Sequence, residues 1–357
     1  MKPRKPTMTD VARAAGVSQT AVSMILSEKG NHSFAPATVE KVHAAAKELG
    51  YILRSAPTAS SSRFIMVISV NGTNPYYTTM VQSVERKAYQ HQYQVLTCHS
   101  YRDPNLELQY LELAAKMKVA GLIVLYYPHC LEKIHEIAKT TPVVCVCDQE
   151  EGLAVDIVEM QHAPAGKLLI DHLVDLGHKK IALITSDLSE NRGRMAFMDG
   201  LRVQMERRGL ADSFIVHMAS AHPMAEMEDA NADYNVGYNL MQDESIYLSG
   251  ATAFVCTNDS MALGVIDALL ERGYKIPDDF SVCGSDNLLY SDLNSISMTT
   301  IDHRMEVKGQ SAMDLLLQKI HMMHNTDHPS TMDDRHTIKY QPLLVVRQST
   351  GPAPFSE

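Results

Sequence analysis

The stretch TMTDVARAAGVSQTAVSMIL, residues 7–26, has the pattern of two short helices separated by a turn at Gly16. Thr7 and Asp10 have the spacing of a capping box, which predicts that the first helix begins at Thr7 and ends at Gly16. Apolar residues at helical spacing form its predicted inner face, Val11, Ala12 and Ala15. Two helices joined so tightly indicate a small helical unit at this end of the chain.

A second helix follows at once, and Ser18 is its predicted N-terminal cap. Apolar residues at positions i, i+3 and i+4 predict an inner face made of Val22, Ile25 and Leu26. The opposite face would carry Gln19, Thr20, Ser23 and Met24. A recognition helix presents such a row to the major groove, so the stretch indicates DNA binding. A helical hairpin inside a larger core is the alternative, and the basic surroundings make it the weaker interpretation.

Residues 36–49 are predicted to form a third helix, because Pro36 suits a first helical turn and Gly50 suits a helix end. Its inner stripe would consist of Val39, Val42, Ala46 and Leu49. The segment SAPTASSS, residues 55–62, is rich in small polar residues and is typical of a linker. We therefore expect a helix-turn-helix DNA-binding domain over residues 1–54 and a hinge over residues 55–63.

The distribution of charge supports this division. Residues 1–54 contain eight Lys or Arg residues and four Asp or Glu residues, a net charge of +4. The whole chain carries −10, so the remainder carries −14. A cationic segment joined to an anionic body indicates that only the segment approaches phosphate.

Composition places the chain among globular proteins. Its 357 residues suffice for two or three domains. No apolar run approaches the ~20 residues of a membrane span, and the first residues lack a signal-peptide apolar region, so we expect a cytoplasmic protein. The six cysteines form no CxxC pair, which favours buried reduced thiols over disulfides or zinc ligands. No metal site and no cofactor are expected.

The body alternates strand-like and helix-like segments, which predicts an α/β core with parallel sheets. Apolar runs of strand length lie at residues 64–70, 95–98, 121–127, 143–147, 180–185, 254–257 and 281–284. Helical patterns between them include residues 80–90, 107–117, 165–176, 194–208 and 260–272.

Polar and aromatic residues follow nearly every predicted strand, where parallel α/β sheets bind their ligands. They are Asn74, Tyr76, Tyr77, Tyr101, Arg102, Asp148, Arg192, Arg194, Asn258, Asp259, Asp286 and Asn287. Carboxylates, amides and arginines suit a small polar ligand, and tyrosine rings suit the apolar face of a ring. Any single member could merely cap the next helix, as Asn258 or Asp259 would. The convergent group favours a pocket.

The whole chain, from residue 7 to about residue 347, resembles the lactose repressor family of bacterial transcription regulators. The resemblance rests on motifs in the family's order: TDVARAAGVSQTAVS, NPYY (74–77), AGLIVL (120–125), HLVDLGHKKIALIT (172–185), CTNDSMALGVIDALLERGYKIPDDFSVCGSD (256–286), TTID (299–302) and PLLVVRQST (342–350). It implies an all-α helix-turn-helix head, a hinge, and an α/β core of two parallel-sheet subdomains resembling a periplasmic sugar-binding protein. It also implies an effector in the cleft between the subdomains and a homodimer on a palindromic operator.

The resemblance also implies boundaries within the core, residues 64–350. The N-subdomain would cover about 64–162 and 303–329, the C-subdomain about 163–302 and 330–350, and residues 351–357 would form a tail. Its implied DNA contacts are Thr7, Met8, Ser18, Gln19, Thr20, Ser23 and Met24. Its implied effector contacts are Asn74, Tyr76, Tyr77, Asp148, Asn258, Asp286 and Arg194, with Arg192 as the alternate arginine.

Two positions depart from the family pattern. Met24 stands where many members carry an arginine that reads guanine, so a different base preference is expected. The hinge is short and lacks the leucine that many members insert into the minor groove, so a less bent operator or a disordered linker is expected.

The sequence thus predicts an allosteric, sequence-specific transcription regulator, a repressor, with double-stranded operator DNA, a small-molecule effector and a second copy of the chain as partners. A neutral sugar is the leading effector, and a purine or nucleoside is the alternative if Tyr76, Tyr77 and Tyr101 stack on a base. Modulation by a partner protein also remains open. A sugar-handling enzyme is remote, because no catalytic motif is present. A solute-binding protein for transport is also remote, because the sequence shows a basic head and no signal-peptide pattern. No long heptad follows Leu317, which favours a dimer over a tetramer.

Overall fold

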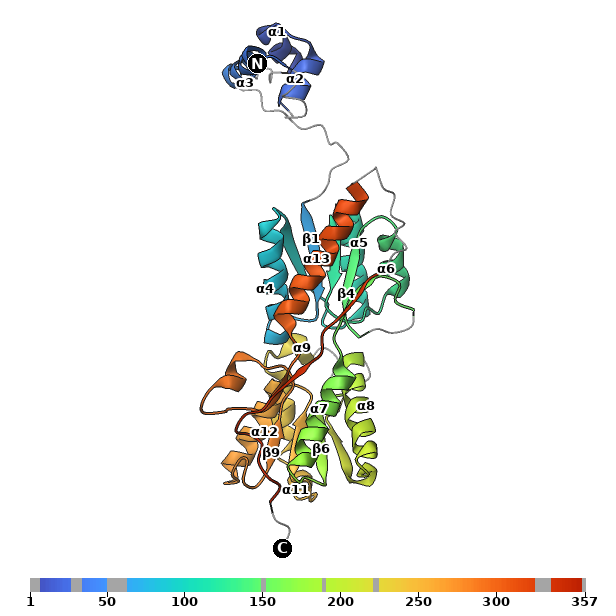
Figure 1. The fold of residues 1–357 in the computed structure, drawn as a ribbon, viewed down its shortest axis with the longest axis vertical. Helices are drawn as coiled ribbons and strands as arrows, with labels where there is room; N and C mark the ends of the chain where they lie inside the picture. The colour runs from blue at the N-terminus through green and yellow to red at the C-terminus, as the bar shows by residue number, and fades with distance from the viewer. Residues whose placement is uncertain are drawn as a thin grey trace. The chain divides into compact units, whose positions relative to one another are not determined.

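The computed structural model describes residues 7–26, 34–49, 63–148, 152–187, 191–220, 225–324 and 335–354. The chain divides into two compact units, Met1–Ser61 and Ser62–Glu357, which we call the head and the core (Figure 1). None of the helices among the described residues has the length and apolarity of a membrane span.

The head contains α1 (Met8–Ala15), α2 (Gln19–Leu26) and α3 (Pro36–Glu48), as predicted. The Thr7 backbone N–H donates to the Asp10 carboxylate over 2.8 Å, and Gly16 ends α1 in the left-handed conformation at φ 69°. The buried core of the head consists of Val11, Ala12, Val22, Ile25, Val42, Ala45 and Ala46.

The prediction of the inner stripe of α3 is wrong at one residue. Leu49 is 39% exposed, because α3 ends at Glu48 and the turn that follows carries Leu49 away from the stripe. Gly50 and the predicted hinge lie outside the described residues, apart from Arg63.

The first subdomain of the core is a parallel six-stranded sheet in the order β11-β5-β4-β3-β1-β2. Its strands are β1 (Phe64–Ser69), β2 (Gln94–His99), β3 (Gly121–Val124), β4 (Val143–Val146), β5 (Asp156–Glu159) and β11 (Thr337–Lys339). Its helices are α4 (Pro75–Gln90), α5 (Pro104–Met117), α6 (Leu131–Ala138) and α13 (Met305–His324). Figure 1 shows α13 beside α4 against this sheet, although more than two hundred residues separate them in the chain.

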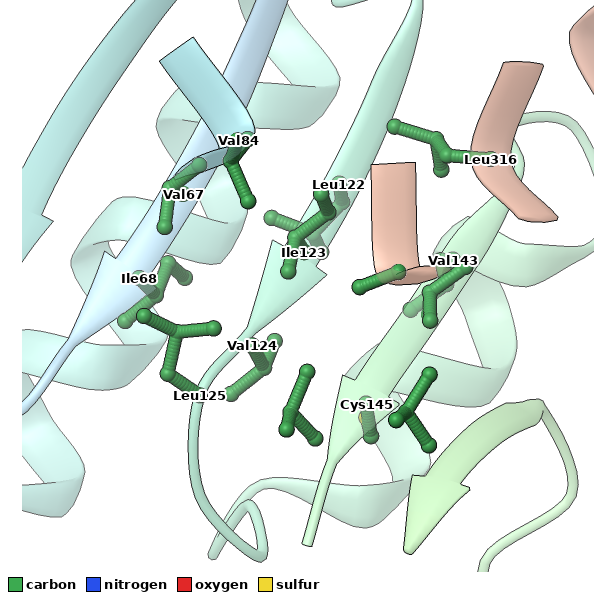
Figure 2. Packing of buried hydrophobic residues seen from close by; sticks show 14 of the residues in the cluster. Val67, Ile68, Val84, Leu122, Ile123, Val124, Leu125, Val143, Cys145 and Leu316 are labelled. Atoms are coloured by element: carbon green, nitrogen blue, oxygen red, sulfur yellow. The ribbon is translucent and has the colours of Figure 1, made fainter. Parts of the chain in front are cut away.

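The central strands of this sheet are buried on both sides. Every residue of β3 and β4 is buried, which is why both strands read as continuous apolar runs. Figure 2 shows Leu316 of α13 near Leu122 and Val143 of these strands, and Val84 of α4 near Val67 of β1.

The second subdomain is a parallel four-stranded sheet in the order β7-β6-β8-β9. Its strands are β6 (Ile181–Thr185), β7 (Phe214–Met218), β8 (Ala253–Cys256) and β9 (Ser281–Cys283). Its helices are α7 (His162–Asp175), α8 (Arg192–Arg207), α9 (Ala225–Glu228), α10 (Ala232–Leu240), α11 (Glu244–Tyr247) and α12 (Asp259–Glu271). The antiparallel pair β10 (Thr300–Asp302) and β12 (Leu343–Val345) completes the core.

Helices α10 and α12 cross at two glycines. A Cβ atom on Gly237 would lie 2.1 Å from the Met261 carbonyl oxygen, and one on Gly264 would lie 2.2 Å from the Tyr234 carbonyl oxygen. Any larger residue would force the helices apart. The crossing fixes the start of α10 next to the start of α12.

Two predicted boundaries need correction. Residues 330–350 were assigned to the second subdomain, but β11 pairs with β5 and so belongs to the first sheet. Residues 351–354 were assigned to a tail, but the Ala353 N–H donates to the Leu176 carbonyl oxygen over 2.9 Å and Gly351 is buried. These segments are short and are held by backbone hydrogen bonds, so their sequences show no periodic pattern of apolar residues that could have predicted their position.

Candidate functional site: the cleft of the core

A cavity of about 280 Å³ lies where the carboxyl ends of the strands in both sheets meet. All eight predicted effector residues line it: Asn74, Tyr76, Tyr77, Asp148, Arg192, Arg194, Asn258 and Asp286. Of the other strand-end residues, Arg102 lines the cavity, whereas Tyr101, Asp259 and Asn287 do not. The structure therefore brings the predicted set together from both subdomains.

The first wall is aromatic. Asn74 caps α4 by accepting the Tyr76 N–H over 2.9 Å, which fixes Tyr76 and Tyr77 in the first helical turn. Their rings meet edge to face at 4.9 Å between centroids. Arg102 donates to the Tyr77 hydroxyl over 2.7 Å. Burial raises the pKa of the Tyr76 hydroxyl, which keeps it a neutral donor.

Asp148 lies at the end of β4 and is held from three sides. Its carboxylate accepts the backbone N–H groups of Gln161 and His162, at 2.6 and 3.3 Å, and its other oxygen lies 2.8 Å from His162 Nδ1. Burial opposes ionisation, but the His162 ring and these hydrogen bonds outweigh it and lower the pKa of Asp148 to about 2. The group is a fixed carboxylate at neutral pH.

Behind the first wall lies Glu107, whose side chain is fully buried. It accepts the backbone N–H groups of His129 and Cys130, at 3.2 and 2.7 Å, and lies 3.3 Å from His129 Nδ1. Burial again opposes ionisation, but the hydrogen bonds from His129 and Cys130 lower the pKa of Glu107. Glu107 thus fixes the loop after β3, whose residues 125–129 line the cavity.

The second wall is made of polar residues at the starts of helices. Asn258 caps α12 by accepting the Met261 N–H over 2.8 Å, and its amide donates to Asp233 over 2.7 Å. Arg194, in the first turn of α8, donates to the other Asp233 oxygen over 2.7 Å and also to the Ser186 hydroxyl. Asn258 therefore both caps a helix and faces the cavity.

Asp286 follows β9 and is buried. Its backbone N–H donates to the Thr300 hydroxyl over 3.1 Å, and that hydroxyl donates to Asp259. Asp259 is fully buried and also accepts the Leu288 N–H over 2.8 Å. Burial, and next the charges of Asp259 and Asp233, raise the pKa of Asp286 well above its usual range. Burial also raises the pKa of Asp259.

Two contacts join the walls. The Arg192 guanidinium lies over the Tyr127 ring, 4.6 Å from its centroid, and links α8 to the loop after β3. The fully buried His303 follows β10, and its Nε2 lies 2.9 Å from the Ser285 hydroxyl. Burial lowers the pKa of His303 well below its usual range, so the ring is neutral.

Sequence reasoning missed several of these residues. His162 follows β5, a strand that the sequence did not reveal, and Tyr127 stood inside a predicted strand that ends at Val124. Asp233 lies in the first turn of a helix that follows no predicted strand. His303 directly follows the TTID motif, which was the one available signal.

Four of the seven residues predicted to contact DNA are exposed on the head. Ser18, Gln19, Thr20 and Met24 are exposed, and Thr7 and Met8 are half-buried. The Gln19 amide donates to the Thr9 hydroxyl, which ties the starts of α1 and α2 together. The Ser23 side chain lies outside the described residues.

Comparisons with known proteins agree with this organisation. The family model described as bacterial regulatory proteins, lacI family, matches residues 7–53, and a periplasmic binding protein-like domain matches residues 170–350. The HTH-type transcriptional repressor PurR of Haemophilus influenzae (strain PittEE) is 30% identical over 351 residues, which cover 96% of this chain and 98% of that protein.

Solved structures share the fold. The Lac repressor dimer bound to operator and the anti-inducer ONPF matches with a TM-score of 0.73 at 24% identity, covering 98% of this chain and all of that one. A LacI family transcriptional regulator from Enterococcus faecium with bound ribose matches with a TM-score of 0.68 at 23% identity, covering 81% of this chain and 99% of that one. The chain therefore belongs to the lacI family of bacterial regulatory proteins, and it is a DNA-binding transcription regulator.

Proposed function

We propose that the protein is a dimeric repressor that binds operator DNA through its head, and that an uncharged sugar in the cavity of the core sets its operator affinity. One observation carries the proposal: a single cavity gathers side chains from both subdomains, so that a ligand there contacts both walls at once. The similar PurR repressor and the operator-bound Lac repressor dimer support the operator-binding part of the proposal, and the ribose-bound regulator supports the sugar.

The proposed DNA contacts lie on two elements of the head. The exposed face of α2 offers Gln19, Thr20 and Met24 to base edges, with Ser18 and Ser23 beside them. Thr7 and Met8 at the start of α1 would contact the backbone, where a helix N-terminus favours phosphate. This function places the protein in the cytoplasm, where the DNA is.

The chemistry of the cavity favours a sugar. A volume of about 280 Å³ suits a ligand of one ring. Asp148 and Asn258 offer carboxylate and amide groups to hydroxyls, and the Tyr76 ring offers an apolar surface to a sugar ring. We assign no enzymatic activity, because the relatives of this chain are transcription regulators.

A purine or nucleoside is the second candidate, and the structure gives it less support. Tyr101, one of the three tyrosines that could stack on a base, does not line the cavity, and Tyr76 and Tyr77 meet edge to face. Phe197 and Tyr127 leave an aromatic surface for a base. The third alternative is a regulator that responds to a partner protein, and such a regulator would need no small-molecule ligand in the cavity.

The proposed coupling is a shift between two arrangements of the core. A ligand that contacts both walls favours one closure angle, which changes the spacing of the paired heads, while operator half-sites require about 34 Å. The ligand and the DNA then alter each other's affinity by the same factor.

Operator binding tests the proposal. A duplex selected from random DNA should bind the full-length chain at low salt and lose affinity steeply as salt rises. The Gln19→Ala, Thr20→Ala double variant should lose about tenfold or more of its specific affinity, because both residues are exposed. The Gln19–Thr9 hydrogen bond that it removes is also exposed, so the free energy of unfolding should fall by no more than about 1 kcal/mol.

The same complex is then titrated with neutral monosaccharides, purine bases and nucleosides. A ligand that binds the core and changes operator affinity in either direction supports the coupling. A ligand that binds the cavity and leaves operator affinity unchanged contradicts it, and a response to purines alone replaces the sugar by the second candidate.

A further inference from the structure

Asp233 lies behind two of the residues that line the second wall. One carboxylate oxygen accepts from Arg194 Nη2 and the other from Asn258 Nδ2, each over 2.7 Å. Asp233 itself does not line the cavity but lines a smaller neighbouring one. The side chains of Asp233 and Arg194 are each 14% exposed, so their pairing is only weakly screened by water.

The two contacts orient donors that would otherwise turn freely toward the ligand. Asn258 is held at both ends, since its carbonyl oxygen accepts the Met261 N–H and its amide donates to Asp233. It retains one amide N–H and one lone pair for a ligand. The crossing of α10 and α12 at Gly237 and Gly264 fixes the distance between Asp233 and this amide.

The charge of Asp233 matters as much as its position. Among the described residues that line the cavity, the arginines are Arg102, Arg192 and Arg194. Arg102 donates to the Tyr77 hydroxyl, and Arg192 lies over the Tyr127 ring. At Arg194 the partner is a carboxylate, and a desolvated arginine is otherwise a strong site for phosphate, sulfate or carboxylate.

We propose that Asp233 is the positioning residue that makes this wall select an uncharged, hydroxyl-bearing ligand, because it occupies and neutralises the Arg194 guanidinium that an anionic ligand would require. The inference deepens the proposed function and rests on it for the role of the cavity. It assigns the absence of an anion site at Arg194 to one residue outside the cavity.

Sulfate is the probe, since it tests anion binding without knowledge of the natural ligand. The full-length chain, Asp233→Asn, Asp229→Asn and the Asp233→Asn, Arg194→Gln double variant are titrated with sodium sulfate against sodium chloride at equal ionic strength. Thermal unfolding and calorimetry measure binding. Asp229 is the matched control, because it lies on the same segment and lines the same smaller cavity, while its carboxylate accepts from Asn231 and Asn235, neither of which lines the main cavity.

Asp233→Asn should bind sulfate about tenfold to a hundredfold more tightly than the unchanged chain, the range that a charge-assisted hydrogen bond supplies. Asp229→Asn should not differ from the unchanged chain, and the double variant should lose the gain. Sulfate bound by the head would affect all four proteins equally. A folded Asp233→Asn variant without a gain overturns the inference.

Should Asp233→Asn fail to fold, the unchanged chain and Arg194→Gln decide the matter. Equal responses of these two proteins to sulfate support the inference, and sulfate binding that Arg194→Gln abolishes overturns it. The proposed function fails separately, through a loss of specific operator binding or of any response to neutral ligands, neither of which changes the sulfate comparison.

Discussion

Each wall of the cleft is fixed from behind by one fully buried carboxylate, but the two carboxylates differ in their environment. Glu107 accepts two backbone N–H groups and faces His129, and its pKa is lowered. Asp259 accepts one backbone N–H and the hydroxyls of Ser291 and Thr300, and burial raises its pKa. Backbone amides and an imidazole stabilise the anion more than hydroxyls do.

The difference shows how a cavity can hold ionised and neutral groups a short distance apart. Glu107 lies behind residues 125–129, the loop after β3, and this loop contributes no carboxylate to the cavity. Asp259 instead connects through Thr300 to Asp286, so two acids are desolvated together and each disfavours the charge of the other. The second wall therefore depends more strongly on its buried acid.

The largest expected effect follows from removing that acid. Asp259→Ala would leave the Leu288 N–H and the hydroxyls of Ser291 and Thr300 buried without an acceptor. We expect a loss of about 3–5 kcal/mol in the free energy of unfolding, measured by urea denaturation. Asp292→Ala is the control: that carboxylate pairs with Arg347 but its side chain is 74% exposed, so a change below about 1 kcal/mol is expected. Equal losses would contradict the comparison.

Glu107→Gln should cost less, about 1–3 kcal/mol at pH 7, because the amide keeps one acceptor oxygen. The sign with pH follows from the lowered pKa. Glu107 contributes stability above the ordinary glutamate pKa of 4.5 and loses it as pH falls through its folded pKa. The difference between the unchanged chain and Glu107→Gln should therefore shrink in acid, as denaturation at pH 7 and pH 4 would measure.

The opposite sign is expected at Asp259. A raised pKa means that its contribution is present at low pH and is lost as pH rises through the folded pKa. The free energy of unfolding of Asp259→Asn should therefore rise relative to that of the unchanged chain as pH increases. If the free energies of unfolding of Glu107→Gln and Asp259→Asn changed with pH in the same direction, the distinction between the two walls would be contradicted.

The smallest effect concerns the Arg192–Tyr127 contact, one of the two that join the walls. A double-mutant cycle of Arg192→Gln and Tyr127→Leu should give a coupling energy of about 0.5–2 kcal/mol in thermal or urea unfolding. A matched cycle of Arg192→Gln with Tyr101→Leu should give none, since Tyr101 does not line the cavity. Additivity in the first cycle would mean that the walls are joined elsewhere.

The elements with strong apolar periods could be predicted from sequence. The buried strands β1, β3, β4, β6 and β8 were recognised within a few residues, because burial on both faces requires continuous apolar runs. The strands β5, β7 and β11 were missed. β5 begins with the buried Asp156 and β11 has a single apolar residue, while the apolar run of the partly buried β7 is interrupted by His217 after three residues.

The site was predictable where it follows a recognised strand. Asp148, Asn258 and Asp286 each follow an apolar run, and the topology of a parallel sheet brings such ends together. Asp233 and Glu107 could not be found in this way, because they act on lining residues from within helices. Their lining partners, Asn258 and His129, lie 25 and 22 residues away in the chain, which no local pattern reveals.

The reciprocal glycines of α10 and α12 restrict how this cleft can change. Sliding would bring side chains of one helix against the backbone of the other at Met261 or Tyr234, so α10 and α12 must move as one rigid body whenever the second subdomain rotates. New ligand preferences can then arise only by exchanging side chains on an unchanged frame. A designer who wishes to enlarge the cleft would do better to trim Phe197 or Tyr127 than to insert residues near this joint.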